Sequence, residues 1–524
     1  MRSIEIVLAL VALATVVAGL AERFKAPAPS LLVVVGLVVG VAPGVPDIVV
    51  TPEVVGLVVL PPLLFAAAEE VPLRELRAVV GIVARLAVGL VAFTAVCVAY
   101  LLHGLLPRVP LAVAFVLGAV LASTDPVAVT ALGRRLRLPT RVGTIVQAES
   151  LFNDATSLVL FTVAVDVVVA GHGVDLPRAA GQFLLLGGGG VVLGCVVALL
   201  AGRVRERTVD ELLETTVALL TPYVAYVGAE AVHVSGVTAV VVAGIVLGRR
   251  PTRLTAARAR LQAGAVYAVV VFLLESVVFS LIGLQLPRLI SRLSGPDRSF
   301  WWPALAVIVV VIGTRVVWLF PAAFGPRLLR RPRNRTDRPA WQAVAVASWA
   351  GTRGVVPLAA ALSIPLTVSG GAPFPHRDLL LVLATSTIVV TLVVQGLTLE
   401  PLVRRLGVME PVEDELHQEA LARHLTARAG LARLEELLEE TSLAPDVAQR
   451  LRQGLQHRVD RARERPPGST SSDPGGDDLR RLRRALLRAE SGELQRLHDE
   501  GEIGDAVLRR LQRQLDLEEA RLSG

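Results

Sequence analysis

The sequence contains few cysteines and almost no lysine. Two of its 524 residues are cysteines, and because Cys97 and Cys195 both lie in apolar runs, a disulfide framework and a cysteine-based metal site are excluded. Lys25 is the only lysine, and no Gly-x-x-x-x-Gly-Lys-Ser/Thr loop occurs, which argues against a nucleotide-driven pump. The Gly-x-Gly-Asp and His-Glu-x-x-His patterns of intramembrane proteases are also missing.

Apolar residues dominate the composition. They make up 53% of the chain, and the mean hydropathy is +0.60, which is too apolar for a soluble enzyme of this length. We read the apolar run after Met1 as a first membrane span rather than as a signal peptide. Thirteen segments have spanning length, and the second and ninth are short. They cover residues 4–21, 29–44, 48–68, 79–104, 110–133, 143–170, 180–202, 211–232, 234–248, 264–286, 301–323, 340–363 and 378–403.

Basic residues are unevenly divided between the loops. The loops after odd-numbered spans carry 22 arginines and lysines, and those after even-numbered spans carry 6. This is the positive-inside pattern, so we expect the N-terminus outside the cell membrane and the C-terminus in the cytoplasm. The pattern also explains much of the net charge of +7 without a nucleic-acid partner.

The chain changes character after the last apolar segment. We expect a membrane domain over residues 1–405, a cytosolic helical segment over 411–464, a flexible linker over 465–478 and amphipathic helices over 479–524. The tail could serve dimerisation and packing, or it could act as a sensor. It has no glycine-rich nucleotide motif to support ligand sensing.

Asp125, Glu149 and Asp154 lie within 30 residues of one another, inside two segments predicted to cross the membrane. A charge at the centre of a bilayer helix costs about 2.5–3.5 kcal/mol on insertion scales, so such a cluster is a candidate ion or proton site. Helical spacing places Ser150 and Asn153 on the same face as Glu149 and Asp154. Ser150 could complete an oxygen shell around a cation such as Na⁺ held by Asp154. The alternative is a set of buried polar groups that satisfy one another.

Two of the predicted spans carry signals for a broken helix. Asp125 is followed by Pro126 and preceded by Ser123 and Thr124, which are residues that cap helices. We expect the helix to stop here and restart with Asp125 near a half-helix end, although Asp125 could also only cap a proline kink. The second break is expected around Arg353, between glycines.

The two predicted breaks suggest an overall topology. Each broken span is the fifth in its half of the chain, and the halves run in opposite directions around span seven. This arrangement predicts two inverted six-helix repeats whose discontinuous helices cross near the membrane midplane. The fold class is therefore an all-α polytopic membrane protein with a cytosolic helical tail.

A buried arginine needs a carboxylate partner. We expect Arg353 to pair with Glu149, with Arg315 in span eleven as the competing candidate. Glu275, in span ten, could face the same site.

In combination, five short motifs resemble the monovalent cation:proton antiporters of the NhaP/NHE type. They occur in the family's order over about the first 405 residues. They are Leu60–Phe65, Ser123–Pro126, Glu149–Asp154, Gly283–Gln285 and Gly351–Gly354.

The resemblance implies roles for particular residues. It implies Asp154 as the exchanging carboxylate and Thr124, Asp125 and Ser150 around the transported ion, so that Asp154, Ser150 and Thr124 are its expected ligands. Asn153, Glu149 and Arg353 would stabilise the site. It also implies a homodimer, and no resident cofactor is expected.

One position departs from the family's pattern. Many relatives carry a carboxylate directly after the Pro-Pro-Leu-Leu-Phe segment, where this chain has Ala66. Glu69 and Glu70 lie about one turn further along and are poor substitutes. The departure bears on which cation is bound and how tightly, and not on the exchange itself. The resemblance implies exchange of Na⁺ for H⁺, with K⁺ or Li⁺ as further candidates, and it links the neutral Asn153 beside Asp154 to an electroneutral cycle. The alternatives are a cation channel that uses the same carboxylates and, with little support, an intramembrane protease.

Overall fold

The computed structural model describes most of the first 408 residues and scattered positions after them. The described ranges are 2–24, 27–42, 55–71, 73–125, 139–171, 176–208, 210–248, 257–293, 295–329 and 341–408. Beyond these, single positions between 425 and 456, and Leu517, are described. Contacts divide the chain into two units, Met1–Met409 and Glu410–Gly524.

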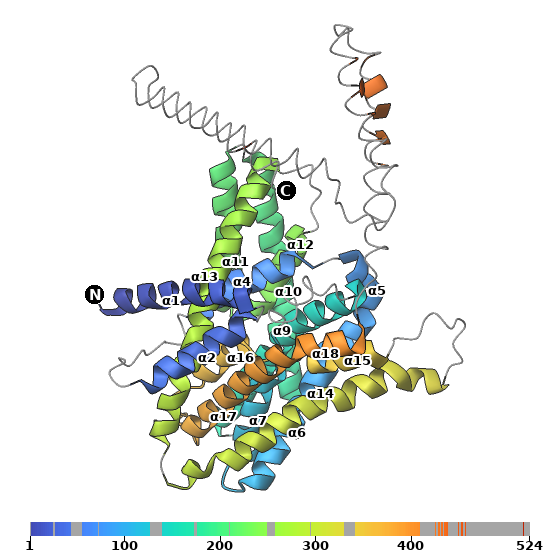
Figure 1. Cartoon of the computed structure of the whole chain (residues 1–524). Helices are drawn as coiled ribbons and strands as arrows, with labels where there is room; N and C mark the ends of the chain where they lie inside the picture. Colours follow the sequence, from blue (N-terminus) through green and yellow to red (C-terminus); the bar gives the residue numbers. More distant parts are fainter. Residues whose placement is uncertain are drawn as a thin grey trace. The chain divides into compact units, whose positions relative to one another are not determined.

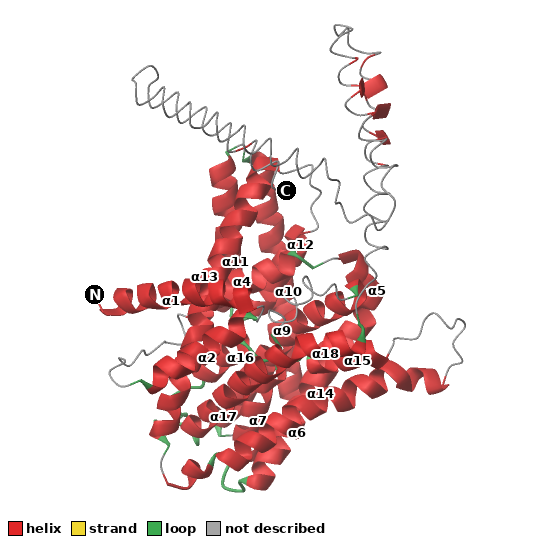
Figure 2. Ribbon diagram, in the orientation of Figure 1, coloured by secondary structure: helices red, strands yellow, loops and turns green. Residues whose placement is uncertain are grey.

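The described part of the chain is helical, as Figures 1 and 2 show. The only β pairing within the described ranges is an isolated bridge between Thr367 and Pro373. The first half contains α1 (Arg2–Phe24), α2 (Ala28–Val41), η1 (Val55–Val59), α4 (Leu60–Glu69), α5 (Leu73–Ala84), η2 (Arg85–Leu90), α6 (Val91–Leu105), α7 (Leu111–Ala122), α9 (Thr140–Ala170) and α10 (Leu176–Arg207). The second half contains α11 (Glu211–Ala231), α12 (Gly236–Gly248), α13 (Ala257–Arg292), η3 (Gly295–Ser299), α14 (Trp301–Leu329), α15 (Trp341–Trp349), α16 (Val355–Leu362), α17 (Arg377–Val390), η5 (Thr391–Gln395) and α18 (Gly396–Leu406).

The helices follow the predicted apolar segments. Each of the thirteen segments overlaps one described helix or a run of consecutive helices. Seven described helices are long and apolar enough to cross a membrane by length and composition, and five shorter helices are also apolar. The polytopic all-helical class is therefore confirmed, while the count of thirteen spans stays a prediction.

Both predicted helix breaks are present. Helix α7 ends at Ala122, and residues 123–125 that follow are not helical. The restart expected after Asp125 falls at residues 126–138, outside the described ranges. In the second broken span, residues 350–354 are unwound between α15 and α16.

The two unwound segments meet and bond to each other. The Asp125 amide donates to the Thr352 carbonyl at 2.7 Å, and the Thr352 hydroxyl donates to the Asp125 carbonyl at 2.8 Å. Backbone groups that a broken helix leaves without partners are thereby satisfied inside the bundle, as a membrane interior requires. The predicted meeting of the two breaks is confirmed, whereas the helix expected after Asp125, and with it the full crossing of two discontinuous helices, lies outside the described residues.

The described ends of spans four, six, ten and twelve gather at one end of the bundle. Arg108, after α6, donates to Asp297 of η3 at 2.7 Å, and His376, before α17, lies 3.7 Å from the same carboxylate. The Ser369 amide donates to the Val169 carbonyl at the end of α9. These contacts put the ends of these four even-numbered spans on one side, as the predicted topology requires. Which side faces the cytoplasm stays a prediction.

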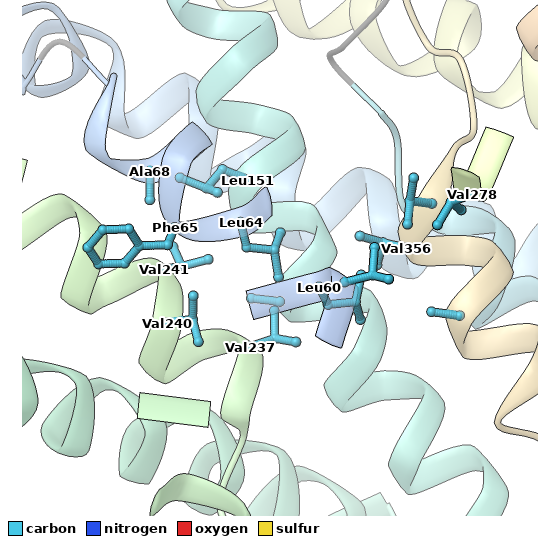
Figure 3. Close-up of a cluster of buried hydrophobic side chains, with 14 of the residues drawn as sticks. Leu60, Leu64, Phe65, Ala68, Leu151, Val237, Val240, Val241, Val278 and Val356 are labelled. Atoms are coloured by element: carbon cyan, nitrogen blue, oxygen red, sulfur yellow. The ribbon is translucent and has the colours of Figure 1, made fainter. Parts of the chain in front are cut away.

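The Pro-Pro-Leu-Leu-Phe segment forms part of the hydrophobic core rather than of a polar site. Figure 3 shows Leu64 and Phe65 of α4 beside Val240 and Val241 of α12, with Leu151 of α9 close by. Ala66 packs against this cluster. Glu69 and Glu70, at the end of α4, are exposed, so the position of the missing carboxylate is occupied by apolar packing.

The second unit is described at a few positions only. Arg452 and Glu435 form an exposed ion pair at 2.6 Å, and the hydrogen bond from Arg452 lowers the pKa of the Glu435 carboxyl. The predicted linker 465–478 and the helices of 479–524, apart from Leu517, lie outside the described residues. The four domain limits stay predictions.

Candidate ion-binding site

One face of α9 carries the four polar residues that the sequence predicts to lie together. Glu149, Ser150, Asn153 and Asp154 are all buried, and Asp154 is 4% exposed. The spacing of one turn between Glu149 and Asn153, and between Ser150 and Asp154, accounts for their common face. Helix α9 therefore presents a polar stripe to the interior of the bundle.

This stripe lies against the unwound segment after α7. The Asn153 amide nitrogen donates to the Thr124 hydroxyl at 2.7 Å, and the Thr124 amide donates back to the Asn153 side-chain oxygen at 3.3 Å. The Ser150 hydroxyl donates to the Thr124 carbonyl. The predicted grouping of Thr124, Ser150 and Asn153 is present, and each contact fixes the break against α9.

The hydroxyl that reaches Asp154 belongs to Ser123. Ser123 donates a hydrogen bond to the Asp154 carboxylate and is fully buried. Sequence reasoning treated Ser123 as a helix-capping residue and did not assign it to the site. The signal was its place in the Ser-Thr-Asp-Pro segment, but the sequence could not show which of the two hydroxyls reaches Asp154 and which reaches Asn153.

Asp125 lies at the start of a helix from the other broken span. Its Oδ2 accepts from the Val355 amide, the first residue of α16, at 3.4 Å. A carboxylate there complements the positive end of the α16 backbone dipole. We expected Asp125 near a half-helix end of its own span, and the described contact is with the opposite span instead.

Gly354 allows this close approach. A Cβ atom at Gly354 would lie 1.5 Å from Oδ2 of Asp125, which is an impossible contact. We therefore expect Gly354→Ala to displace Asp125 and to lower cation-driven proton flux at least about tenfold, since overpacking a filled site costs about 1–3 kcal/mol. The flux is measured in proteoliposomes at equal protein content.

Gly143→Ala is the matched control for that substitution. Gly143 lies in α9, and an added Cβ there meets no heavy atom within 4 Å. Its flux should equal that of the wild type. Wild-type flux in Gly354→Ala would contradict the close packing of Asp125 against α16.

The predicted pairing of Arg353 with Glu149 is wrong. The Arg353 Nε donates to the Leu121 carbonyl at 2.8 Å, and Nη1 donates to the Gly351 carbonyl. Both carbonyls lie where a helix ends, at α7 and after α15, so they lack partners of their own. Arg353 sits in the unwound segment itself, and its positive charge stabilises the negative ends of two half-helices.

Glu149 pairs with the competing candidate, Arg315 of α14. The guanidinium binds both carboxylate oxygens, with Nη2 to Oε2 at 2.8 Å, and Nε donates to the Ala347 carbonyl at 3.1 Å. The exposed fractions are 2% for Arg315 and 1% for Glu149. A fully buried bidentate pair of this kind stabilises the position of α9 beside α14 and α15.

Glu275 lies on the buried side of α13. It is partly buried, it precedes the buried Val278 and Phe279 by one helical turn, and its charge interacts with that of Asp125. Figure 3 shows Val278 near Val356, the second residue of α16. Asp125 contacts the amide of the residue before it, Val355. The expectation that Glu275 faces the site agrees with this placement, but its role stays a prediction.

The oxygen atoms around Asp154 suit a hard monovalent cation. Ser123 supplies a hydroxyl oxygen to the Asp154 carboxylate, and the same unwound segment carries the Thr124 carbonyl, which accepts from Ser150, and the Asp125 carboxylate. Such cations prefer oxygen ligands, and no nitrogen or sulfur ligand is needed. Within the described ranges there is no group of three or more histidine, cysteine or acidic side chains of the kind that holds a resident metal.

Comparisons with known proteins agree with these observations. Residues 8–405 match the family model described as sodium/hydrogen exchanger, transmembrane. The chain is 35% identical to an uncharacterized Na⁺/H⁺ exchanger, Rv2287, of Mycobacterium tuberculosis over 99% of this chain and 96% of the relative. It is 32% identical to the sodium, potassium, lithium and rubidium/H⁺ antiporter of Bacillus subtilis over 75% of this chain and 61% of the relative.

A solved structure shares the fold. The sodium proton antiporter MjNhaP1 from Methanocaldococcus jannaschii matches with a TM-score of 0.62 at 20% identity, over 78% of this chain and 99% of that one. With the family match and the relatives above, this similarity agrees with the resemblance expected from the five motifs. The chain belongs to the transmembrane sodium/hydrogen exchanger family and is a multi-pass membrane transporter.

Proposed function

We propose that the protein exchanges Na⁺ for H⁺ and that both ions compete for the Asp154 carboxylate. The observation that carries this proposal is the position of Asp154, which is buried and bonded to the unwound segment after α7, where that segment meets the unwound residues 350–354. An empty, charged carboxylate is costly in this place, so it favours either a proton or a cation. Thr124, Asp125 and Ser150 surround the ion, and Ser123 joins them.

The proposed stoichiometry is one cation for one proton. Asn153, beside Asp154, is neutral. Both the nitrogen and the oxygen of its side-chain amide are hydrogen-bonded to Thr124. Asp154 is therefore the only titratable group of the Asn-Asp pair. With Arg353 bound to carbonyls and Arg315 bound to Glu149, the exchange cycle is electroneutral.

The range of cations extends to K⁺ and Li⁺ in this proposal. Two similar proteins, from Bacillus pumilus and Bacillus subtilis, are named sodium, potassium, lithium and rubidium/H⁺ antiporters. Ala66 and its apolar neighbours offer no carboxylate from α4. A site with one fewer charged ligand discriminates less between monovalent cations by field strength.

We further propose the cellular setting. The protein resides in the plasma membrane as a homodimer, with its N-terminus outside and the tail in the cytoplasm. The arginine asymmetry between loops supports this orientation.

Reconstitution in proteoliposomes tests the proposed exchange. The purified full chain is exposed to outward and inward gradients of Na⁺, K⁺ and Li⁺ at several pH values, and proton movement is followed with a pH-sensitive dye. We expect the proton flux to reverse when the cation gradient is reversed, with no dependence on membrane potential. Cation flux that does not drive protons would indicate the channel instead.

A further inference from the structure

A turn of π-helix interrupts the last span close to the ion site. The segment η5 (Thr391–Gln395) lies between α17 and α18, and Thr391, Leu392 and Gln395 in it are buried. π-Helical turns are rare, leave the regular bonding pattern of the α-helix and occur frequently at functional sites. This turn has no part in the site as described so far.

Thr391, the first residue of η5, reaches the unwound segment of the neighbouring span. Its Oγ1 accepts from the Arg353 backbone amide at 3.2 Å and donates to the Thr387 carbonyl at 2.9 Å. Because residues 350–354 are not helical, the Arg353 amide has no carbonyl of its own helix to bond to. Thr391 supplies the acceptor, and the residue is fully buried.

The same π-helical turn is also hydrogen-bonded to α2. The Ser30 hydroxyl donates to the Leu392 carbonyl at 2.7 Å, and Ser30 is fully buried. A Cβ at Gly396 would lie 2.4 Å from the Ser30 hydroxyl oxygen, so only glycine admits this contact. The turn is therefore bonded to α2 on one side and to the unwound segment on the other.

The bonds continue from Thr391 to the ion site. The segment that Thr391 holds includes Thr352, which exchanges two hydrogen bonds with Asp125. Thr124 and Ser123, the two residues before Asp125, contact Asn153 and Asp154. Movement of the 350–354 segment would therefore change the position of the oxygens around Asp154.

We propose that Thr391 is a positioning residue for cation binding. Its hydroxyl sets the place of the unwound segment, and the bond from Ser30 to Leu392 sets the place of the turn that carries Thr391. This inference rests on the proposed exchange function. Thr391 and Ser30 are not among the residues proposed to bind the ion. Both act on the site through the contact between Thr352 and Asp125.

Two substitutions at Thr391 test the role of the hydroxyl in the full-length protein. Thr391→Val keeps the shape but loses the hydroxyl, and Thr391→Ser keeps the hydroxyl. We expect Thr391→Val to raise the KM for Na⁺ about five- to tenfold with a smaller change in kcat, the size expected for one buried hydrogen bond. Thr391→Ser should restore the wild-type KM.

Thr387→Val is the matched control. Thr387 lies one turn earlier on α17, is equally buried, and its hydroxyl donates to the Leu383 carbonyl of its own helix. Its KM should be that of the wild type. If Thr391→Val gives the same KM as Thr387→Val, or if Thr391→Ser is as impaired as Thr391→Val, the proposal is overturned.

Ser30→Ala provides a second test should Thr391→Val not fold. We expect a rise in the KM for Na⁺ of about two- to fivefold, because η5 loses its bond to α2. An unchanged KM would overturn the role given to the turn. Wild-type exchange is measured first, so absence of cation-driven proton flux there refutes the proposed function, whereas wild-type exchange with unchanged variants refutes only the positioning role.

Discussion

Asp154→Asn is expected to abolish exchange. The substitution keeps the size of the side chain and its contact with Ser123 but removes the group that alternates between proton and cation. A positioned proton-transfer side chain contributes a factor of about 100 or more, so cation-driven proton flux should fall to the level of empty liposomes. The measurement is dye-monitored proton movement in proteoliposomes under an imposed Na⁺ gradient.

The same helix offers a control for charge removal. Asp166 lies near the other end of α9, is exposed, and accepts a hydrogen bond from Gln182 at 2.6 Å. Asp166→Asn should retain wild-type flux. Exchange at the wild-type rate in Asp154→Asn, or equal loss in Asp166→Asn, would contradict the assignment of the exchanging carboxylate.

Arg315→Met is expected to destabilise the protein by about 3–5 kcal/mol. The substitution leaves the Glu149 carboxylate buried without its bidentate partner, and an uncompensated buried charge is strongly unfavourable. The measurement is the thermal unfolding of the detergent-solubilised protein. Adding Glu149→Gln to Arg315→Met should recover much of the lost stability, because both charges are then gone.

A surface ion pair provides the comparison. Arg404 and Glu400 are one turn apart on α18 at 2.8 Å, with the arginine side chain 57% exposed. Arg404→Met should cost about 1 kcal/mol or less. The account of the buried pair is wrong if Arg315→Met unfolds at the wild-type temperature, or if the double variant is no more stable than Arg315→Met alone.

Hydropathy and local breaking signals predicted the fold well. Apolar runs of spanning length are set by local composition, so the described helices overlap all thirteen predicted segments. Pro126 after Ser-Thr-Asp and the glycines around Arg353 are also local signals, and α7 and α15 stop where these signals occur. Polar residues inside a membrane span are expected to face the interior of the bundle. This expectation predicted that the polar residues of α9 share one buried face.

The contacts between spans could not be predicted in the same way. Arg315 and Arg353 lie in neighbouring spans, and nothing in the sequence fixes the rotation of α14 about its axis. The rotation of α14 places Arg315, and not Arg353, against Glu149. Arg353 instead binds the carbonyls of Leu121 and Gly351, which the ends of the helices leave without partners. The contact of Asp125 with α16, and the role of Ser123, also depend on how distant segments cross.

The dependence of the KM for Na⁺ on pH tests the central claim most directly. If one proton and one cation compete for Asp154, the KM should rise as the pH falls, approaching about tenfold per pH unit at low pH, while the maximal rate stays the same. The measurement is the initial rate of Na⁺-driven proton movement in wild-type proteoliposomes. The pH is initially equal on both sides, and the Na⁺ concentration is varied up to saturation at each pH. If lowering the pH instead reduces the maximal rate and leaves the KM for Na⁺ unchanged, competition at a single carboxylate is contradicted.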